Sequence, residues 1–145
     1  MSPEGPIHAS RIRKVGNYLR SLLDGLALVS EAHPITLQQS EPEPDLAIVQ
    51  LPEERYDERH PVAADILWLI EISDTTLLTD LNRKCQIYAA AGIDEYWLVN
   101  VPDNCLMVFR QPIGQDYTNK LELRAGEVSA IAFPDTKMSV NRFLE

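Results

Sequence analysis

Residues 66–72 read Ile66-Leu67-Trp68-Leu69-Ile70-Glu71-Ile72, and this stretch decides the fold of the chain. Its side chains are apolar, β-branched or aromatic at nearly every position, which predicts a strand buried on both faces of a sheet. The exception is Glu71. An unpaired carboxylate inside a sheet loses its hydration without compensation, so this residue needs a cation, a proton or several hydrogen-bond donors.

A second acidic residue opens another apolar run. Pro44-Asp45 directly precedes residues 46–49, which read as a strand from Asp45 to Gln50. Because side chains alternate along a strand, Glu71 should share one face with Leu67 and Leu69, and Asp45 can face the same side if the two strands pair. Two carboxylates that converge in this way offer hard oxygen ligands suited to magnesium or manganese. The pattern predicts a metal site for phosphodiester hydrolysis.

The helix expected after this strand adds a third group. Asp80, Lys84 and Tyr88 are spaced by four residues, so they should line one face of a helix that stops at Gly92. A lysine beside a bound water can orient that water or offset the charge of a phosphoryl group. The simpler reading is that Asp80 and Lys84 form an exposed helix pair worth a few tenths of a kcal/mol, with Tyr88 as a core aromatic.

The order of elements predicts an α/β domain with a mixed β-sheet flanked by helices over residues 1–145, a single domain with additional strands near its C-terminus. The expected elements are a helix at 8–23, strands at 26–29, 35–38, 45–50, 66–72, 95–101, 106–110, 120–124 and 128–132, a helix from about 76 or 80 to 91, a surface loop at 51–61 and a last short segment at 140–144.

Composition is that of one globular domain with a real core, since the chain has 145 residues of which 45% are hydrophobic. No stretch is apolar for long enough to span a membrane. The first six residues lack the charged and apolar regions of a signal peptide, so a cytoplasmic location is expected. Cys85 and Cys105 show no zinc or disulfide spacing and are expected to be reduced fillers of the core.

The net charge of −9 opposes binding to nucleic acid, because it repels the negative phosphate groups. The acidity is uneven, however. Residues 41–60 hold seven acids against two arginines, whereas the first helix carries four basic residues against Asp24 alone. Any affinity for nucleic acid should therefore be modest and salt-sensitive.

Several short motifs occur together in a fixed order. They are Pro44-Asp45, Leu69-Ile70-Glu71-Ile72-Ser73, Asp80-x-x-x-Lys84-x-x-x-Tyr88 and Ala91-Gly92-Ile93-x-Glu95-Tyr96-Trp97-Leu98-Val99, flanked by Met1-Ser2-Pro3 with His8, and by Gly126-Glu127 and Phe133-Pro134. In this order and spacing the chain resembles the Uma-type restriction endonuclease family of the PD-(D/E)XK nuclease superfamily. The resemblance covers nearly the whole chain and implies a restriction-endonuclease-like fold.

The resemblance implies an endonuclease that hydrolyses DNA with magnesium, or plausibly manganese. Carried over by position, Asp45 and Glu71 become metal ligands, the main-chain carbonyl of Ile72 a further ligand, and Lys84 a catalytic residue. Superfamily members usually carry a lysine two residues beyond the glutamate, where this chain has Ser73; the lysine of the following helix replaces it.

Two departures from the family pattern bear on activity. The sequence starts at the Met-Ser-Pro stretch, ahead of which family members often carry a hairpin. It also has Asn100 where an aspartate commonly follows the aromatic strand. The competing interpretation is a catalytically degenerate domain of the same fold that binds nucleic acid or a protein partner. Cutting both strands normally needs a homodimer or two encounters, and residues 106–110 are a candidate edge for association.

The individual residues also keep simpler interpretations open. Asp45 after a proline can serve only to cap a turn. Glu71 can form a buried salt bridge with an arginine such as Arg83, which would make the domain purely structural. Residues 73–76 are expected to be a helix-capping loop. His8 can approach the cleft from the first helix, whereas His33 and His60 precede prolines and are expected in loops.

Overall fold

The computed structural model describes residues 5–74 and 78–145, without the side chains of Leu78 and Asp80. Within these residues a six-stranded sheet has the order β1-β2-β3-β4-β5-β6, in which β3 and β4 are parallel and all other neighbours antiparallel. The strands are β1 (Leu28–Glu31), β2 (Leu46–Val49), β3 (Ile66–Ser73), β4 (Glu95–Asn100), β5 (Cys105–Ile113) and β6 (Asp116–Leu123). The prediction of a mixed sheet flanked by helices is confirmed.

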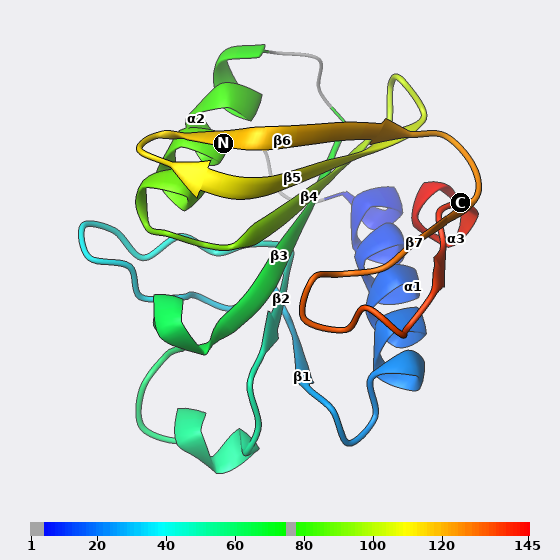
Figure 1. The fold of residues 1–145 in the computed structure, drawn as a ribbon. Helices are drawn as coiled ribbons and strands as arrows, with labels where there is room; N and C mark the ends of the chain where they lie inside the picture. Colours follow the sequence, from blue (N-terminus) through cyan, green and yellow to red (C-terminus); the bar gives the residue numbers. More distant parts are fainter. Residues whose placement is uncertain (1–4, 75–77) are drawn as a thin grey trace.

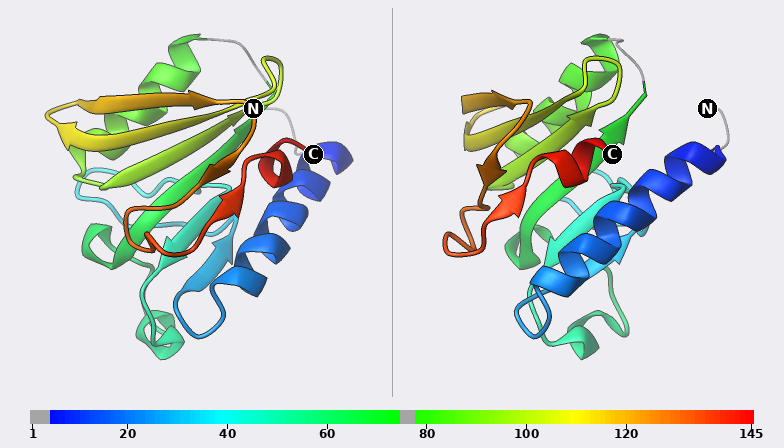
Figure 2. Two further views of the ribbon diagram at one scale, coloured as in Figure 1. Left: turned by 45° about the vertical axis from the view of Figure 1, so that its right-hand side comes forward. Right: turned by 90° about the vertical axis from the view of Figure 1, so that its right-hand side faces the viewer.

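Helices cover the sheet on both faces (Figures 1 and 2). One face carries α1 (Pro6–Leu22) together with the C-terminal elements β7 (Glu127–Val128), β8 (Met138–Ser139) and α3 (Asn141–Leu144). The opposite face carries α2 (Leu78–Ala90). Two short 3-10 helices, η1 (Glu53–Tyr56) and η2 (Ala63–Asp65), lie between β2 and β3. None of the described helices is long and apolar enough to cross a membrane.

The first core lies between α1 and the sheet. Pro6 occupies the first turn of α1, where its missing N–H costs nothing and its fixed φ suits a helix. From there the buried positions recur at helical spacing through Ile12, Val15 and Leu19. They pack against alternate residues of the central strands, among them Trp68 and Trp97, whose ring centroids are 5.4 Å apart.

The second core lies beneath α2. Tyr88 and Ala89 of the helix pack with Tyr96, Leu98 and Phe109 of the sheet. Tyr96 and Tyr88 meet edge to face with centroids 5.1 Å apart, and Tyr96 stacks on Phe109.

The helix α2 ends as the sequence predicts. Gly92 has a φ of +76°, a conformation that residues with a Cβ rarely adopt, and the Ile93 N–H returns to the Tyr88 carbonyl. This sharp stop turns the chain directly into β4, which runs parallel to β3.

Several expected elements differ from the structure. Residues 35–38 make a single parallel bridge, between Thr36 and Val62, instead of a strand. The last short segment, expected at residues 140–144 without a type, is a helix over residues 141–144. The expected edge at residues 106–110 is wrong, because β5 lies inside the sheet between β4 and β6. Short apolar runs of this kind fit either a strand or a buried helix, and tertiary packing decides between them.

The start of β3 departs from strict alternation. Ile66 packs in the core beneath α2 and Leu67 packs against the core beneath α1, the reverse of what period two predicts. The cause is a register shift in the β2–β3 pairing between Ile48 and Val49. Beyond this irregularity Leu69 and Ile70 alternate as expected, so the prediction holds for the half of the strand that carries Glu71.

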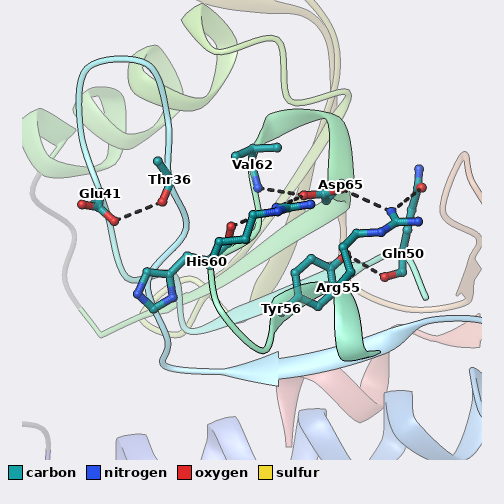
Figure 3. A network of polar contacts seen from close by, with 9 residues as sticks. Thr36, Glu41, Gln50, Arg55, Tyr56, His60, Val62 and Asp65 are labelled. Atoms are coloured by element: carbon teal, nitrogen blue, oxygen red, sulfur yellow. Dashed lines mark hydrogen bonds and ion pairs between the residues drawn. The ribbon is translucent and has the colours of Figure 1, made fainter. Parts of the chain in front are cut away.

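The acidic loop between β2 and β3 is tied down by a buried carboxylate at its end (Figure 3). Asp65 accepts hydrogen bonds from Arg59 at 2.8 Å, from Arg55 at 3.3 Å and from the Val62 N–H at 3.0 Å. Burial by itself would raise the pKa of Asp65, but these hydrogen bonds outweigh it and lower the pKa below its ordinary value. The loop is therefore an ordered structural feature.

A second buried carboxylate fixes the C-terminal segment to the sheet. Glu95 accepts hydrogen bonds from the Trp97 indole at 2.6 Å, from Arg110 at 2.8 Å and from the Ile131 N–H at 2.7 Å. Arg110 also donates to the Ser129 carbonyl at 2.5 Å. The carboxylate is buried but fully satisfied, so its role is structural.

Candidate active site

Asp45 and Glu71 lie side by side across the β2–β3 pair. Leu46 pairs with Ile70, so the next position along places Asp45 opposite Glu71 and on the same face. The main chain locks the two together: the Asp45 N–H donates to Glu71 Oε1 at 3.2 Å, and the Ile72 N–H donates to Asp45 Oδ2 at 2.7 Å. The expected pairing of these two strands is thus present, and Asp45 bonds across strands instead of capping a local turn.

Glu71 is almost completely buried, with 2% of its surface exposed. Its Oε2 accepts a hydrogen bond from the Tyr88 hydroxyl at 2.7 Å and lies 3.2 Å from the Lys84 ammonium. Burial raises the pKa of Glu71 above its ordinary value, Lys84 opposes this rise, and the nearby Asp45 adds to it. The carboxylate therefore lies in a poorly hydrated place, where its charge is stable only with a cation, a proton or hydrogen-bond donors beside it.

Two of these partners come from one face of α2. Lys84 and Tyr88 are one turn apart, and both reach the same Glu71 oxygen. Tyr88 is buried, and burial raises its pKa, so its hydroxyl stays protonated and donates. Lys84 keeps 50% of its side chain exposed, so its ammonium faces both the carboxylate and solvent. The side chain of Asp80, expected on this face, lies outside the described residues.

His8 approaches the site from the first turn of α1. Its Nε2 lies 3.5 Å from Asp45 Oδ1, and its Nδ1 lies 3.4 Å from Asp74 Oδ2, just beyond the end of β3. The sequence offers one signal for this position, a histidine in the helix turn nearest the Met-Ser-Pro stretch, but its spacing from Asp45 carries no ligand pattern.

A pocket of about 370 Å³ opens over Glu71. Its lining combines polar groups of β3 and α2 with apolar side chains from beneath the helix and with residues of the segment before β2. The lining residues are Pro42, Glu43, Glu71, Ile72, Ser73, Leu81, Arg83, Lys84, Ile87, Tyr88 and Leu98. Asp45 lies beside this pocket and not in its wall. A small ligand can therefore reach Glu71 and Lys84 from solvent.

The ion pair of Glu71 answers one alternative left open by the sequence. Its partner is Lys84, while Arg83 lines the same pocket. Tyr88 is a core aromatic as expected, but it is also a direct hydrogen-bond donor to the site, which periodicity does not reveal. Helical spacing places Tyr88 on the same helix face as Lys84, but it does not predict which group the Tyr88 hydroxyl contacts.

The candidate site offers few side-chain ligands for a metal ion. In the parts of the chain that the structure describes, no three His, Cys, Asp or Glu side chains converge as a metal cluster. Asp45 and Glu71 are two oxygen donors, and hard divalent cations complete their coordination with main-chain oxygens and water. The chemistry of the pair thus fits magnesium or manganese as one part of a ligand set.

Comparison with known proteins gives a family and a fold. The sequence profile of the Uma2 family, described as "Putative restriction endonuclease", matches residues 1–141. Among solved structures, a "putative nuclease belonging to DUF820" from Anabaena variabilis superposes with a TM-score of 0.73 at 18% identity, covering 99% of this chain and 82% of that one. The type IIG restriction endonuclease BpuSI gives a TM-score of 0.49 at 16% identity, covering 95% of this chain and 14% of that one. No protein of curated function matches.

Proposed function

Because this chain belongs to the Uma2 family of restriction-endonuclease-like proteins, we propose that it is a metal-dependent endonuclease that hydrolyses DNA phosphodiester bonds. The observation that carries this proposal is that Glu71 contacts two other segments, through the main-chain N–H of Asp45 and the ammonium of Lys84. Asp45 and Glu71 face each other across β2 and β3, and the Lys84 ammonium from α2 lies 3.2 Å from Glu71 at an open pocket. A carboxylate and an ammonium group that line a solvent-facing pocket, with a second carboxylate beside it, are groups that phosphodiester hydrolysis can use.

In the proposed site Asp45 and Glu71 would hold a magnesium or manganese ion, with the carbonyl of Ile72 as a further ligand. The Ile72 N–H points to Asp45, and the N–H and C=O of one strand residue leave the strand on the same side, so this carbonyl is directed toward the same region. A cation bound there would activate water and neutralise charge on the phosphoryl oxygens.

The remaining residues have separate tasks in this proposal. The Tyr88 hydroxyl fixes the orientation of the Glu71 carboxylate from within the core. Lys84 is half exposed, so its ammonium can orient the attacking water or offset charge on the phosphate. The Ile72 N–H holds one oxygen of Asp45, Oδ2, while the other, Oδ1, faces His8 Nε2 at 3.5 Å.

DNA as the substrate has to be reconciled with the net charge of −9. On α1, Arg13 and Lys14 are exposed, whereas Arg20 pairs with Glu31 and Arg11 donates to the main chain of Glu145. Within α1 the unpaired cationic surface is therefore small, and we propose weak, salt-sensitive binding that depends on the site for much of its strength. Cutting of both strands would then require a homodimer or two encounters.

Calorimetric titration of magnesium and manganese tests the proposal, with nicking of supercoiled plasmid measured on the same samples. The variants are Asp45→Ala and Glu71→Ala, and Asp24→Ala is the control because it removes an exposed carboxylate after α1. We expect wild type and the control to bind metal and nick DNA, and both site variants to do neither. Binding without nicking would favour the degenerate binding domain, and absence of binding by wild type at millimolar metal would refute the proposal.

A further inference from the structure

His8 joins two carboxylates that lie on different segments. Its Nε2 is 3.5 Å from Asp45 Oδ1, before β2, and its Nδ1 is 3.4 Å from Asp74 Oδ2, after β3. His8 and Asp45 are mostly buried, with side-chain exposures of 21% and 18%, whereas Asp74 is 54% exposed. The imidazole is therefore placed between the candidate site and a carboxylate at the surface.

The two oxygens of Asp45 have different surroundings. Oδ2 accepts the Ile72 N–H at 2.7 Å, and Oδ1 faces His8. A neutral imidazole carries one hydrogen, and when this hydrogen is on Nδ1, next to Asp74, Nε2 is an acceptor beside a second acceptor, Oδ1. Two acceptors this close are stable together only when a cation or a proton lies between them.

The separation of these two acceptors suits a shared cation. Ligand atoms about 2.1 Å from one ion are roughly 3.0–3.4 Å apart for angles between a right angle and the tetrahedral angle. Histidines that bind metals generally donate their other ring N–H to a carboxylate, which is the place that Asp74 occupies next to Nδ1.

We propose that His8 Nε2 is a ligand of the divalent cation bound by Asp45, with Asp74 as the residue that orients the ring. This inference rests on the proposed function, because it requires that the site binds a cation. No three His, Cys, Asp or Glu side chains converge as a metal cluster among the described residues. The proposal therefore requires the side chain of His8 or of Glu71 to move toward the ion. An imidazole ligand favours manganese over magnesium, because magnesium prefers oxygen donors alone.

The test compares manganese with magnesium in calorimetric titrations of the full chain, with no DNA present. We expect wild type to bind manganese at least tenfold more tightly than magnesium. His8→Ala should weaken manganese binding by tenfold or more and change magnesium binding by less than threefold. Asp74→Asn should weaken manganese binding severalfold. His33→Ala, which removes an exposed histidine elsewhere, should leave both affinities unchanged.

Three results would overturn the inference. If His8→Ala lowers both affinities by one common factor, or lowers neither, His8 is not a ligand, and the proposed nuclease function stands provided that metal binding still depends on Asp45 and Glu71. If wild type binds neither ion, the inference and the proposed function fail together. Circular dichroism checks that His8→Ala is folded, and His8→Gln, which keeps a polar side chain without an imidazole, takes its place if it is not.

Discussion

Three buried tyrosines have hydroxyl groups with different hydrogen-bond acceptors. Replacing each tyrosine by phenylalanine therefore tests the environment of Glu71. Tyr88 donates to the Glu71 carboxylate at 2.7 Å, and Tyr117 donates to the neutral carbonyl of Ile93 at 2.8 Å. The Tyr96 hydroxyl is buried without a hydrogen-bond partner among the described residues. All three side chains are at most 1% exposed, so burial of the ring is the same in each case.

The expected loss of stability depends on the group that accepts the hydrogen bond from each tyrosine hydroxyl. A hydrogen bond to an ionised group contributes about 1.5–3 kcal/mol, and a neutral one about 0.5–1.5 kcal/mol. Tyr88→Phe should therefore lower the free energy of unfolding by about 2 kcal/mol and Tyr117→Phe by about 1 kcal/mol. Tyr96→Phe removes a buried hydroxyl with no partner, and it should change stability by less than about 0.5 kcal/mol or increase it.

Urea unfolding followed by tryptophan fluorescence measures these differences, since Trp68 and Trp97 are both buried in the core. Slopes equal to that of wild type would show that only stability has changed. The reasoning is refuted if Tyr88→Phe costs no more than Tyr96→Phe, because Glu71 would then not be an ionised acceptor held by this hydroxyl. A double-mutant cycle with Glu71→Gln should reduce the cost of Tyr88→Phe toward that of Tyr117→Phe.

Further predictions concern the other buried groups. Asp65 has a lowered pKa, so its stabilisation is complete above the ordinary carboxyl pKa and is lost as pH falls through the folded value. Asp65→Asn should cost about 1–3 kcal/mol at pH 7 in urea unfolding, and progressively less as the pH falls below the ordinary carboxyl pKa. A cost that does not change with pH would contradict this. Glu95→Gln should cost about 3 kcal/mol, because it removes the buried carboxylate charge that pairs with the part-buried Arg110 guanidinium. Exposed Glu122→Gln should cost less than about 0.5 kcal/mol, and equal costs would show that the Glu95 contacts contribute nothing. Burial raises the pKa of Cys85 to about 11, so little of its thiol is ionised at pH 8.5. The thiol should therefore react with Ellman's reagent roughly a hundredfold more slowly in native than in urea-unfolded protein. Equal rates would mean that burial does not protect the thiol.

The sequence predicts the sheet and the paired carboxylates because both depend on short-range pattern. An acidic residue in the apolar run at residues 66–72 has few stable environments, and Pro44-Asp45 begins the strand that pairs with it. Helical spacing predicts that Lys84 and Tyr88 share one face of a helix, and in the structure both side chains reach Glu71. The face of each side chain follows from the period of a strand or helix, whereas the pairing of the two strands is a condition that the sequence leaves open.

Contacts between elements distant in sequence could not be predicted in this way. The sequence allows His8 to approach the cleft from the first helix but does not place it there. His8 is 37 positions before Asp45, and the packing of α1 on the sheet brings the two together. The register shift at Val49 and the helix at residues 141–144 likewise depend on neighbours that no local pattern specifies. Sequence thus located the acids and the lysine, but not the residues that hold them in position.

The most direct test of the proposed nuclease is the nicking of supercoiled plasmid by wild type, Lys84→Met and Lys120→Met in magnesium, each with a chelator control. Lys120 is a half-exposed lysine paired with exposed Asp116 on β6, so its replacement matches the loss of charge without touching the site. The account predicts metal-dependent nicking by wild type and Lys120→Met, and at least a hundredfold slower nicking by folded Lys84→Met. Equal rates for the two variants, or nicking that survives the chelator, would contradict it.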